Sequence, residues 1–412
     1  MGAHRRLACR VAAALGVLVV ASLGLAACGG GGADAPLPPV PARTASTDPF
    51  DDAVLHYVDL TVAEADLPTL VPFTGDYVPC DVRYDETDVA RVGLRIKGES
   101  TARPVGDKPS WTLKTNEFVP GQRLHGKKKL HLHNCVFDAS FLHEPVAYGL
   151  WRRAGAPARR TAHARVTLNG RYLGVYVVVE PYDDGFLDAH FADGDGNLYE
   201  GVLGIDVTEP AALELDTNED ENDRADLEAL AHVLLVEPDA ALEAALDRTL
   251  AVESFLSYLA VEALLHHWDG YAGQNVPSWV IGPNPPHNWY AYGDPSDGGR
   301  VTFLPHSADT AFFDLYAPVL APPAPAAVLA VRVLAHPSLR ARFIDRVREI
   351  LDTAWDTDAL LAEIDVAERR ILASVHEGDA NADFELSTVA DELGRLRRFI
   401  RLRPEIVRPT LR

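Results

Sequence analysis

The sequence predicts an α+β protein with two lobes, and three observations support this. Residues 53–135 and 160–200 alternate between apolar and polar side chains at the period of two that is typical of strands. From about residue 225 onward, apolar residues recur at helical spacing. One more helix is expected between the two runs of strands. A β-rich lobe of residues 53–182 and a mostly helical lobe of residues 183–412 would leave a cleft between them, where ligands commonly bind.

The strand-rich half is predicted from short alternating segments. "RVGLRIKG" and "SWTLK" alternate strictly, and "ARVTLNGRYLGVYVVVE" predicts a hairpin because Asn169-Gly170 is a type I′ turn signal between two apolar runs. Between these segments, "DASFLHEPVAYGLWRRAG" predicts a helix that Asp138 or Ser140 caps and Gly155 ends.

The back half is predicted from helical periodicity. "VESFLSYLAVEALLHHW" and "SLRARFIDRVREILDTAW" each place apolar residues along one face of a helix, and residues 358–374 and 384–402 do the same. These long segments make the second lobe mostly helical.

Composition limits the function classes. The chain has 412 residues, of which 47% are apolar, enough for two or three packed units. Its 38 basic and 60 acidic side chains give a net charge of −22. A nucleic-acid-binding protein needs a cationic face, so this balance argues against that role. The acidity suits a basic partner or a metal-requiring site, and it also serves solubility.

The N-terminus predicts export. Three arginines precede an apolar run that is too short for a good membrane span. The run ends in "LAAC", which resembles the lipobox of bacterial lipoproteins, whose cysteine is acylated. This resemblance implies a lipoprotein signal peptide at residues 1–27, a membrane anchor through acylated Cys28, and a cell-envelope location, periplasmic or on the outer surface. An ordinary secretory signal is the alternative. The Gly/Pro-rich residues 28–52 predict a flexible tether.

Two cysteines remain in the folded part, Cys80 and Cys135. In an exported protein they can form a disulfide. Two buried, unpaired cysteines are the alternative, and the sequence does not decide between them.

Two segments of the back half supply candidate catalytic carboxylates. In "HHWDGYAGQN" a helix ends, Asp269 follows in a glycine-flanked loop, and Gln274 and Asn275 come five and six positions later. Protein kinases place a catalytic base and a Mg²⁺-binding amide at about this spacing. In "RVTFLPHSADTAFF" a strand ends at a proline and delivers Asp309, where a second, metal-binding aspartate is needed.

Several segments, taken in order, resemble those of the CotH kinases, a family of atypical protein kinases. The matching segments run from about residue 55 to the C-terminus and are "LRIKGESTARPVGDKPSWTLK", "KLHLHN" through the hairpin, "NLYEG", "HHWDGYAG", "NWYAYGDPSDGGRVTFLP" and "RLRPEIVRPTL". The resemblance implies a two-lobed, atypical protein-kinase-like fold. It also implies that the protein binds ATP with Mg²⁺ or another divalent metal and phosphorylates protein Ser or Thr.

Carried onto this sequence, the resemblance implies a role for each candidate residue. Asp269 is the expected catalytic aspartate, and Asp309 is the expected metal ligand, with Gln274 and Asn275 as further metal ligands. The nucleotide-binding residues are expected to be Lys108 and Lys97 near the phosphates, Glu144 as the helix glutamate, and Glu180 at the junction of the lobes.

The sequence also departs from the family pattern. Ser307 stands where the family has a carboxylate beside Asp309, and a neutral oxygen is a poorer Mg²⁺ ligand. Glu99 would repel phosphate in the phosphate loop. Two hypotheses follow. One is a lipid-anchored kinase acting on a protein substrate of basic or serine-rich character. The other is a pseudokinase-type surface binding module with a weakened metal site. Neither involves nucleic acid.

Overall fold

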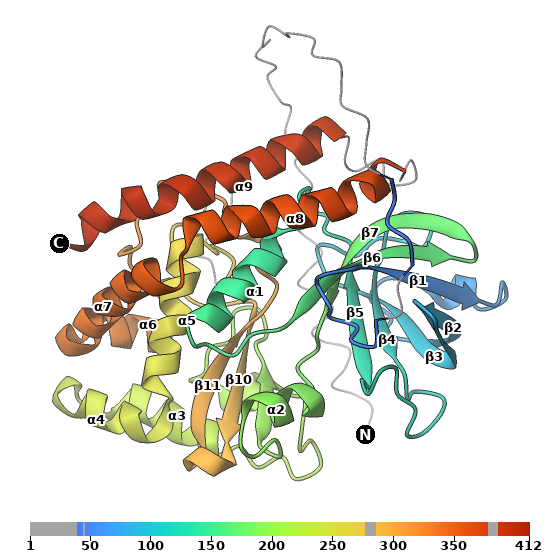
Figure 1. The fold of residues 1–412 in the computed structure, drawn as a ribbon. Coiled ribbons are helices and arrows are strands. Elements are labelled where there is room, and N and C mark those ends of the chain that lie inside the picture. Colours follow the sequence, from blue (N-terminus) through green and yellow to red (C-terminus); the bar gives the residue numbers. More distant parts are fainter. Residues whose placement is uncertain (1–38, 44–45, 277–285, 378–385) are drawn as a thin grey trace, which may run out of the picture. The chain divides into compact units, whose positions relative to one another are not determined.

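Seven strands of the N-terminal half close into a barrel in the order β1-β2-β3-β4-β5-β7-β6 (Figure 1). Neighbouring strands are antiparallel except β1 and β6, whose parallel pairing closes the barrel. The strands are β1 (Leu55–Val62), β2 (Val78–Tyr84), β3 (Thr87–Lys97), β4 (Ser110–Lys114), β5 (Lys129–His133), β6 (Thr161–Leu168) and β7 (Arg171–Val179). The closure was not predicted from the sequence, because β1 and β6 are far apart along the chain.

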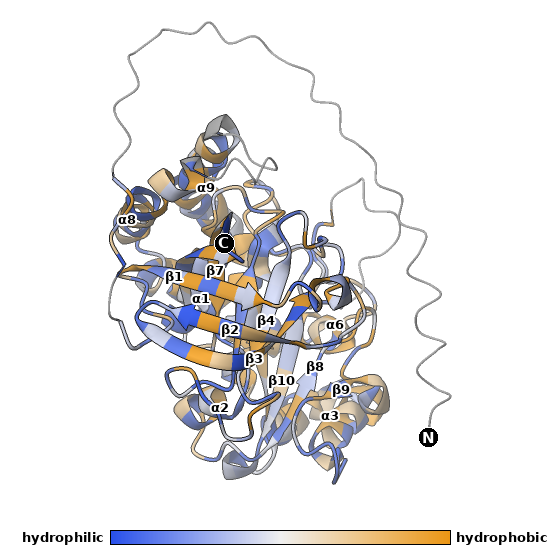
Figure 2. Ribbon diagram, turned by 90° about the vertical axis from the view of Figure 1, so that its right-hand side faces the viewer, coloured by the Kyte–Doolittle hydropathy of each residue, from blue (hydrophilic) through white to orange (hydrophobic). Residues whose placement is uncertain are grey.

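Alternating side chains fill the barrel. Every second residue of β1 and β2 is buried, and Figure 2 shows this alternation as bands of hydrophobic and hydrophilic colour along the strands. The inward side chains form one apolar cluster, which includes Val58, Leu60, Val82, Leu94, Leu113, Leu132, Val166 and Val178. The period-two pattern therefore marks the barrel interior.

The turn between β6 and β7 is the predicted type I′ turn. Asn169 and Gly170 both have positive φ, at 49° and 79°, as this turn requires. The Asn169 side chain also pins the hairpin to β1, because its Oδ1 accepts from Val62 N–H over 2.8 Å and its Nδ2 donates to the Val62 carbonyl over 2.9 Å.

The structure, a computed structural model, describes residues 39–43, 46–276, 286–377 and 386–412. The predicted signal peptide and Cys28 lie outside the described residues. In the part of the chain that the structure describes, no helix is long and apolar enough to cross a membrane.

The predicted tether of residues 28–52 extends too far. Phe50 belongs to the apolar cluster of the barrel, and Asp48 forms an ion pair with Arg160 over 2.8 Å. The carbonyl of Pro49 accepts from the Tyr84 hydroxyl. The end of the tether is therefore packed on the barrel.

Cys80 and Cys135 are both buried and both free. Burial raises the pKa of each thiol. Of the two alternatives left open by the sequence, the structure favours the unpaired one.

The helix α1 (His143–Arg153) connects β5 to β6 but packs outside the barrel, against α5. The N-cap position is Leu142 rather than Asp138 or Ser140, but both predicted side chains accept from backbone N–H groups at the start of the helix. Asp138 Oδ2 accepts from the N–H of His143 over 2.8 Å, and Ser140 Oγ accepts from the N–H of Leu142 over 3.1 Å. Gly155 follows the helix with a φ of 82°.

The C-terminal part is helical around a small sheet. The sheet has the order β11-β10-β8-β9, with β8 (Asn197–Glu200), β9 (Glu214–Leu215), β10 (Trp289–Asp294) and β11 (Arg300–Pro305). The α-helices are α2 (Asp184–His190), α3 (Ala225–Val236), α4 (Asp239–Thr249), α5 (Val252–Leu265), α6 (Val328–Ala335), α7 (Pro337–Thr353), α8 (Thr357–His376) and α9 (Leu386–Val407). Short 3₁₀ helices are η3 (Leu67–Thr69), η4 (Pro210–Ala212), η5 (Pro295–Asp297), η6 (Ala308–Thr310) and η7 (Arg408–Leu411).

Two details of this part differ from the sequence prediction. The run 160–200, predicted as strands, contains the helix α2, whose N-cap Asp183 accepts from the N–H of Phe186. The helix α5 is not amphipathic: every residue from Phe255 to Leu265 is buried. A helix that is buried on all sides has no polar, solvent-facing side. The apolar periodicity in the sequence of α5 therefore identified only one of the faces that pack against neighbouring elements.

Candidate active site

Asp269 lies in the loop after α5, and this helix shapes the loop. The helix is followed by His266, whose backbone is left-handed with a φ of 47°. The buried carboxylate of Glu262, one turn earlier, accepts from the N–H groups of Tyr271 and Ala272 over 3.2 and 2.7 Å. The loop therefore folds back over the end of the helix that precedes it.

Gly270 is the point of closest approach in this loop. A Cβ at Gly270 would lie 2.7 Å from the carboxyl carbon of Glu262 and 2.8 Å from Nδ1 of His267. Both neighbours are buried and cannot easily move aside. Packing thus requires the glycine that follows Asp269.

Asn288, directly before β10, is the amide that contacts Asp269. Its Nδ2 donates to the Asp269 backbone carbonyl over 2.8 Å and to Oδ2 over 3.0 Å. Nδ1 of His287 lies 3.5 Å from Oδ1 of the same carboxylate. Burial would lower the pKa of His287, but the hydrogen bond and charge of Asp269 raise it above its ordinary value. Neither partner was predicted from the sequence.

Strand pairing brings the second aspartate to the same place. Trp289 at the start of β10 pairs with Pro305 at the end of β11, and the N–H of His306 donates to the Asn288 carbonyl over 3.2 Å. The segment after β11, which carries Asp309, therefore begins beside Asn288. The pairing is visible only in the structure, so no local sequence pattern pointed to Asn288.

Two histidines hold the backbone of the segment that carries Asp309. Nδ1 of His143, on α1, lies 2.7 Å from the Asp309 carbonyl, and Nε2 of His143 lies 3.2 Å from Glu392 of α9. Nε2 of His267 donates to the Ser307 carbonyl over 3.1 Å. The Ser307 hydroxyl is 3.4 Å from Oδ1 of Asp309, so the side chain that Ser307 places beside this carboxylate is neutral.

Asp309 lies among like charges. Burial, followed by the charges of Glu144, Asp269 and Asp138, raises the pKa of Asp309 to about 7. Asp269, in the loop after α5, is thus close enough for its charge to act on Asp309.

Asp269, Asp309 and Asn288 provide oxygen ligands that fit a divalent metal bound together with a nucleotide. Among the described residues, no three His, Cys, Asp or Glu side chains form a metal-binding group. Mg²⁺ at nucleotide sites commonly uses one or two carboxylates together with phosphate oxygens. Asp269, Asp309 and the amide of Asn288 match that set, and a cation would neutralise the like charges that, after burial, raise the pKa of Asp309.

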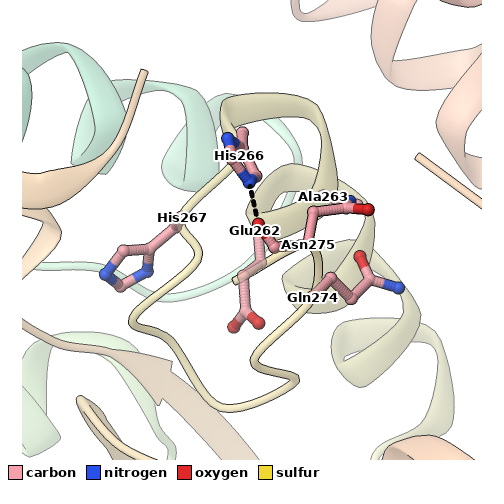
Figure 3. A pocket seen from close by; sticks show the side chains of 6 residues that line it. All are labelled: Glu262, Ala263, His266, His267, Gln274 and Asn275. Carbon is pink, nitrogen blue, oxygen red and sulfur yellow. Dashed lines mark hydrogen bonds between the residues drawn. The ribbon is translucent and has the colours of Figure 1, made fainter. Parts of the chain in front are cut away.

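Gln274 and Asn275, the predicted amide ligands, are placed elsewhere. Gln274 donates to the Ala321 carbonyl over 2.7 Å, and Asn275 donates to the Pro318 carbonyl over 2.9 Å. Figure 3 shows both in a small hollow that Glu262 and the two histidines after α5 also line. Their amides tie the Asp269 loop to residues 318–321, so their predicted contact with the metal is not supported by this placement.

Lys97, at the end of β3, is joined to Glu144 through a histidine. Nζ of Lys97 lies 2.6 Å from Nε2 of His133, and Nδ1 of His133 lies 2.5 Å from Oε2 of Glu144. Burial, then the charge of Arg159, lowers the pKa of Lys97 to about 8, while Glu144 and Asp309 oppose this shift. Lys97 is therefore near enough to both carboxylates to sense their charge.

Lys108 lies against aromatic rings. Its buried Nζ is 4.6 Å from the ring centroid of Phe141 and 5.1 Å from that of Tyr176. Both Lys108 and Lys97 were predicted from the sequence to lie near the phosphates. The structure links Lys97, through its hydrogen-bond chain, to the helix glutamate.

Glu180 is engaged in ion pairs at the end of β7. Its carboxylate contacts Lys127 over 3.0 Å and Arg160 over 3.0 Å, and it also accepts from the N–H of Arg160. Burial raises its pKa, but these partners lower it below the ordinary value overall. With its oxygens bound to two cations, Glu180 holds the barrel end together. The predicted role in nucleotide binding is not supported by these contacts.

Arg159 is a fully buried cation that was not predicted from the sequence as a site residue. Its Nη1 lies 2.7 Å from Nδ1 of His306, and its guanidinium stacks on the rings of Tyr182 and Tyr290, at 4.0 and 5.3 Å from their centroids. Its charge acts on Lys97 as well. No motif marked it, because an arginine before a strand is usually exposed.

The comparison with known families assigns the chain. The sequence profile described as "CotH kinase protein" matches residues 94–407, well over half of the chain. The chain belongs to the CotH kinase family. The match includes Lys97, Glu144, Asp269 and Asp309.

Two individual proteins are also similar. Invasin CotH2 of Rhizopus delemar is 26% identical over 218 residues, which cover 49% of this chain and 34% of the invasin. The chain thus spans about a third of that CotH relative. The crystal structure of a Helicobacter pylori proinflammatory kinase, CtkA, aligns with 81% of this chain and 95% of its own, at 10% identity. Its TM-score of 0.28 is too low to indicate a shared fold.

Proposed function

We propose that this CotH-family chain is a protein kinase that transfers the terminal phosphoryl group of ATP to serine or threonine hydroxyls of proteins. The observation that carries the proposal is that Asn288, directly before β10, hydrogen-bonds Asp269, while Asp309 follows the end of the paired strand β11 within range of the charge of Asp269. In this proposal the barrel and the helical part act as the two lobes of an atypical kinase-like fold. Phosphoryl transfer needs positioned carboxylates and a phosphate-binding cation.

Asp269 serves as the catalytic aspartate. Asn288 fixes one of its carboxylate oxygens, and the loop that carries it is anchored on Glu262. The carboxylate remains partly open, with 24% of its side chain exposed. It is thus available to orient an acceptor hydroxyl and to take its proton.

Asp309 and Asn288 would hold a divalent metal together with the nucleotide. When bound, the metal neutralises phosphate charge and orients the transferred group. Lys97 would contact the phosphates, and the buried charge of Arg159 adds to the positive potential around it. These two cations offset the carboxylates of the site.

The substrate and location are proposed on sequence grounds. The "LAAC" segment supports acylation at Cys28 and an exported, membrane-anchored protein. The net charge of −22 favours a protein substrate of basic or serine-rich character over nucleic acid. Replacing Cys28 with Ser should abolish incorporation of labelled palmitate in cells, and label that persists in this variant would rule out the lipoprotein proposal.

The activity is tested by binding and turnover together. Calorimetry of ATP with and without Mg²⁺ measures nucleotide binding, and ³²P transfer to a generic basic protein and to the chain itself measures turnover. Asp269→Asn should keep nucleotide binding and lose roughly 10²–10⁴-fold in transfer, as expected for removal of a positioned base. Unchanged transfer in this variant would remove Asp269 from its role.

A binding module without catalysis is the second candidate, and Ser307 favours it. This hydroxyl lies beside Asp309 where the family has a carboxylate, so the metal site has one strong ligand fewer. If wild-type protein shows neither Mg²⁺–ATP binding nor transfer, the acidic surface is the better guide to function, and a basic protein partner is expected.

A further inference from the structure

Three hydrogen bonds link four side chains in a chain that crosses from the barrel to α1. Nζ of Lys97 lies 2.6 Å from Nε2 of His133, Nδ1 of His133 lies 2.5 Å from Oε2 of Glu144, and the Tyr148 hydroxyl donates to Oε1 of Glu144 over 3.0 Å. Glu144 is 2% exposed and Tyr148 is fully buried. Each oxygen of the carboxylate therefore has its own partner.

The donors and acceptors of this chain fit in one arrangement. A lysine ammonium only donates, so Nε2 of His133 must accept, and Nδ1 then carries the proton that is given to Glu144. Burial lowers the pKa of His133, which keeps the imidazole neutral as this arrangement requires. His133 thus relays the negative charge of Glu144 to Lys97 without adding a charge of its own.

Strand alternation explains why a histidine stands there. On β5, Leu130 and Leu132 point into the barrel core, so His131 and His133 project from its outer face. Lys97 is the last residue of β3 in the same barrel, and Glu144 lies in the first turn of α1. The gap between the lysine and the glutamate is spanned by the ring of His133.

We propose that His133 is a positioning residue that couples Glu144 of α1 to Lys97 and so holds the lysine for phosphate binding. The inference rests on the proposed nucleotide site and deepens it. Protein kinases commonly pair such a lysine and glutamate directly. Here the pair is extended by one neutral ring, so the orientation of α1 and the position of Lys97 depend on a third side chain.

The charges around His133 show why Lys97 needs this support. Arg159, buried before β6, acts on both Lys97 and His133, and His131 and His306 lie close enough to sense the same charges. Burial and Arg159 lower the pKa of Lys97 to about 8, so its positive charge is marginal. Glu144, reached through His133, is a main group that maintains it.

The test uses the full chain with two variants at position 133 and one control. His133→Leu removes both hydrogen bonds. His133→Gln keeps one acceptor and one donor. His131→Leu, on the same face of β5 with its Nδ1 3.2 Å from the Thr112 hydroxyl, controls for loss of a histidine from this strand. Thermal unfolding of each variant checks that it folds.

The first readout is the titration of Lys97 itself, which needs no ligand. The chain has only six lysines, so NMR of isotope-labelled lysine side chains can resolve Lys97, with Lys97→Arg giving its assignment. In His133→Leu the pKa of Lys97 should fall, while in His133→Gln and His131→Leu it should stay near the wild-type value. A pKa that is unchanged or raised in His133→Leu would show that Lys97 and Glu144 pair without the histidine and would overturn the proposal.

The second readout is Mg²⁺–ATP binding measured from pH 6.5 to pH 9. His133→Leu should weaken binding by about tenfold or more, the scale of one charge-assisted hydrogen bond, and should move the alkaline loss of affinity to lower pH. Glu144→Gln should have a similar effect alone but little further effect in the His133→Leu background, because the two act through one chain. Additive effects would contradict coupling.

The two readouts separate this inference from the proposed function. If wild-type protein binds no Mg²⁺–ATP, the nucleotide site is refuted, yet the lysine titration still reports whether His133 couples Glu144 to Lys97. If ATP binds but the pKa of Lys97 is the same in wild type and in the position-133 variants, the nucleotide site is supported and the positioning role of His133 is wrong.

Discussion

The side-chain amide of Asn288 donates to both the backbone carbonyl and the carboxylate of Asp269, over 2.8 and 3.0 Å. One side chain therefore fixes the position of the loop and the rotamer of the proposed catalytic group. Since β10 begins at the next residue, the anchor is part of the sheet that also leads to Asp309. Catalytic geometry of this kind is sensitive to displacements of about 1 Å.

Replacing Asn288 with Leu should lower phosphoryl transfer by about 10²-fold through misplacement of Asp269. The matched control is Asn275→Leu, which removes the amide that the sequence pattern favoured and that donates to Pro318. Steady-state transfer and ATP binding by both variants give the comparison. If Asn275→Leu were the more damaging change at equal stability, the assignment of the amide to Asn288 would be wrong.

Gly270→Ala should destabilise the fold by about 1–3 kcal/mol, since its Cβ would lie 2.7 Å from Glu262 in a packed interior. Gly394→Ala is the control, because no heavy atom apart from its chain neighbours and the nearby helix backbone lies within 4 Å of its Cβ position in α9. That change should stabilise the helix by about 0.5–1 kcal/mol. Urea unfolding measures both, and a stable Gly270→Ala protein would show that the loop is not held against the helix.

Glu262 should make stability depend on pH. Burial raises its pKa to about 7, although hydrogen bonds from Ala272, Tyr258 and Tyr271 oppose the shift. A carboxyl with a raised folded-state pKa contributes stability that is fully present below its unfolded pKa, about 4.5, and is lost as pH rises through about 7. The stability of wild type relative to Glu262→Gln should therefore fall between these pH values. A constant difference across this range would argue against a protonated Glu262.

Arg403 joins the two segments that carry the aspartates. From α9 it donates to the carbonyls of Ala263 and Leu264 at the end of α5 and to those of Leu315 and Ala317 after Asp309. It lies in the terminal "RLRPEIVRPTL" segment, which the family resemblance marked without giving it a role.

Arg403→Met should cost about 3 kcal/mol or more, because several buried carbonyls lose their partners at once. Arg397→Met is a suitable control, because Arg397 forms ion pairs with Asp365 and Glu368, whose side chains are exposed or half-buried. The free energies of unfolding of the two variants, measured with a chemical denaturant, should differ by more than about 1 kcal/mol. Equal losses would mean that Arg403 does not bridge these segments.

Local patterns predicted the local structure well. Asn169-Gly170 fixed the hairpin, because both residues need positive φ and these two residue types tolerate it. The periodic runs located α5 and α7, although the pattern could not show that α5 is buried on all sides. The barrel closure between β1 and β6 depends on a non-local parallel pairing, which no local pattern encodes.

The choice among equivalent side chains was beyond the sequence. Asn275 and Asn288 both have a φ of 52°, a conformation that asparagine tolerates. Asn275 follows Asp269 closely in the chain, and Asn288 follows it after an insertion. Only the pairing of β10 with β11 places one of them at the carboxylate. Likewise, Lys97 and Lys108 flank the same loop, and the position of α1 decides which one is linked to Glu144.

Ser307 determines how strongly the site holds a divalent metal. Its hydroxyl lies 3.4 Å from Oδ1 of Asp309, and its backbone is left-handed with a φ of 46°. Aspartate and asparagine are the non-glycine residues that adopt this conformation most readily, so both can replace Ser307 without backbone strain. Ser307→Asp adds a charge beside the metal position, and Ser307→Asn adds the same shape without it.

Ser307→Asp should tighten Mg²⁺-dependent ATP binding by about 1–3 kcal/mol, the scale of a charge-assisted interaction, whereas Ser307→Asn should change it little. Without metal, the new carboxylate should destabilise the protein, because Asp309 already lies among like charges that raise its pKa to about 7. Calorimetry of ATP with and without Mg²⁺, and thermal unfolding in EDTA, measure the two effects. Equal and tight Mg²⁺–ATP binding in wild type and Ser307→Asp would show that the natural site is complete. An equal gain in Ser307→Asn would show that shape, rather than charge, limits the site.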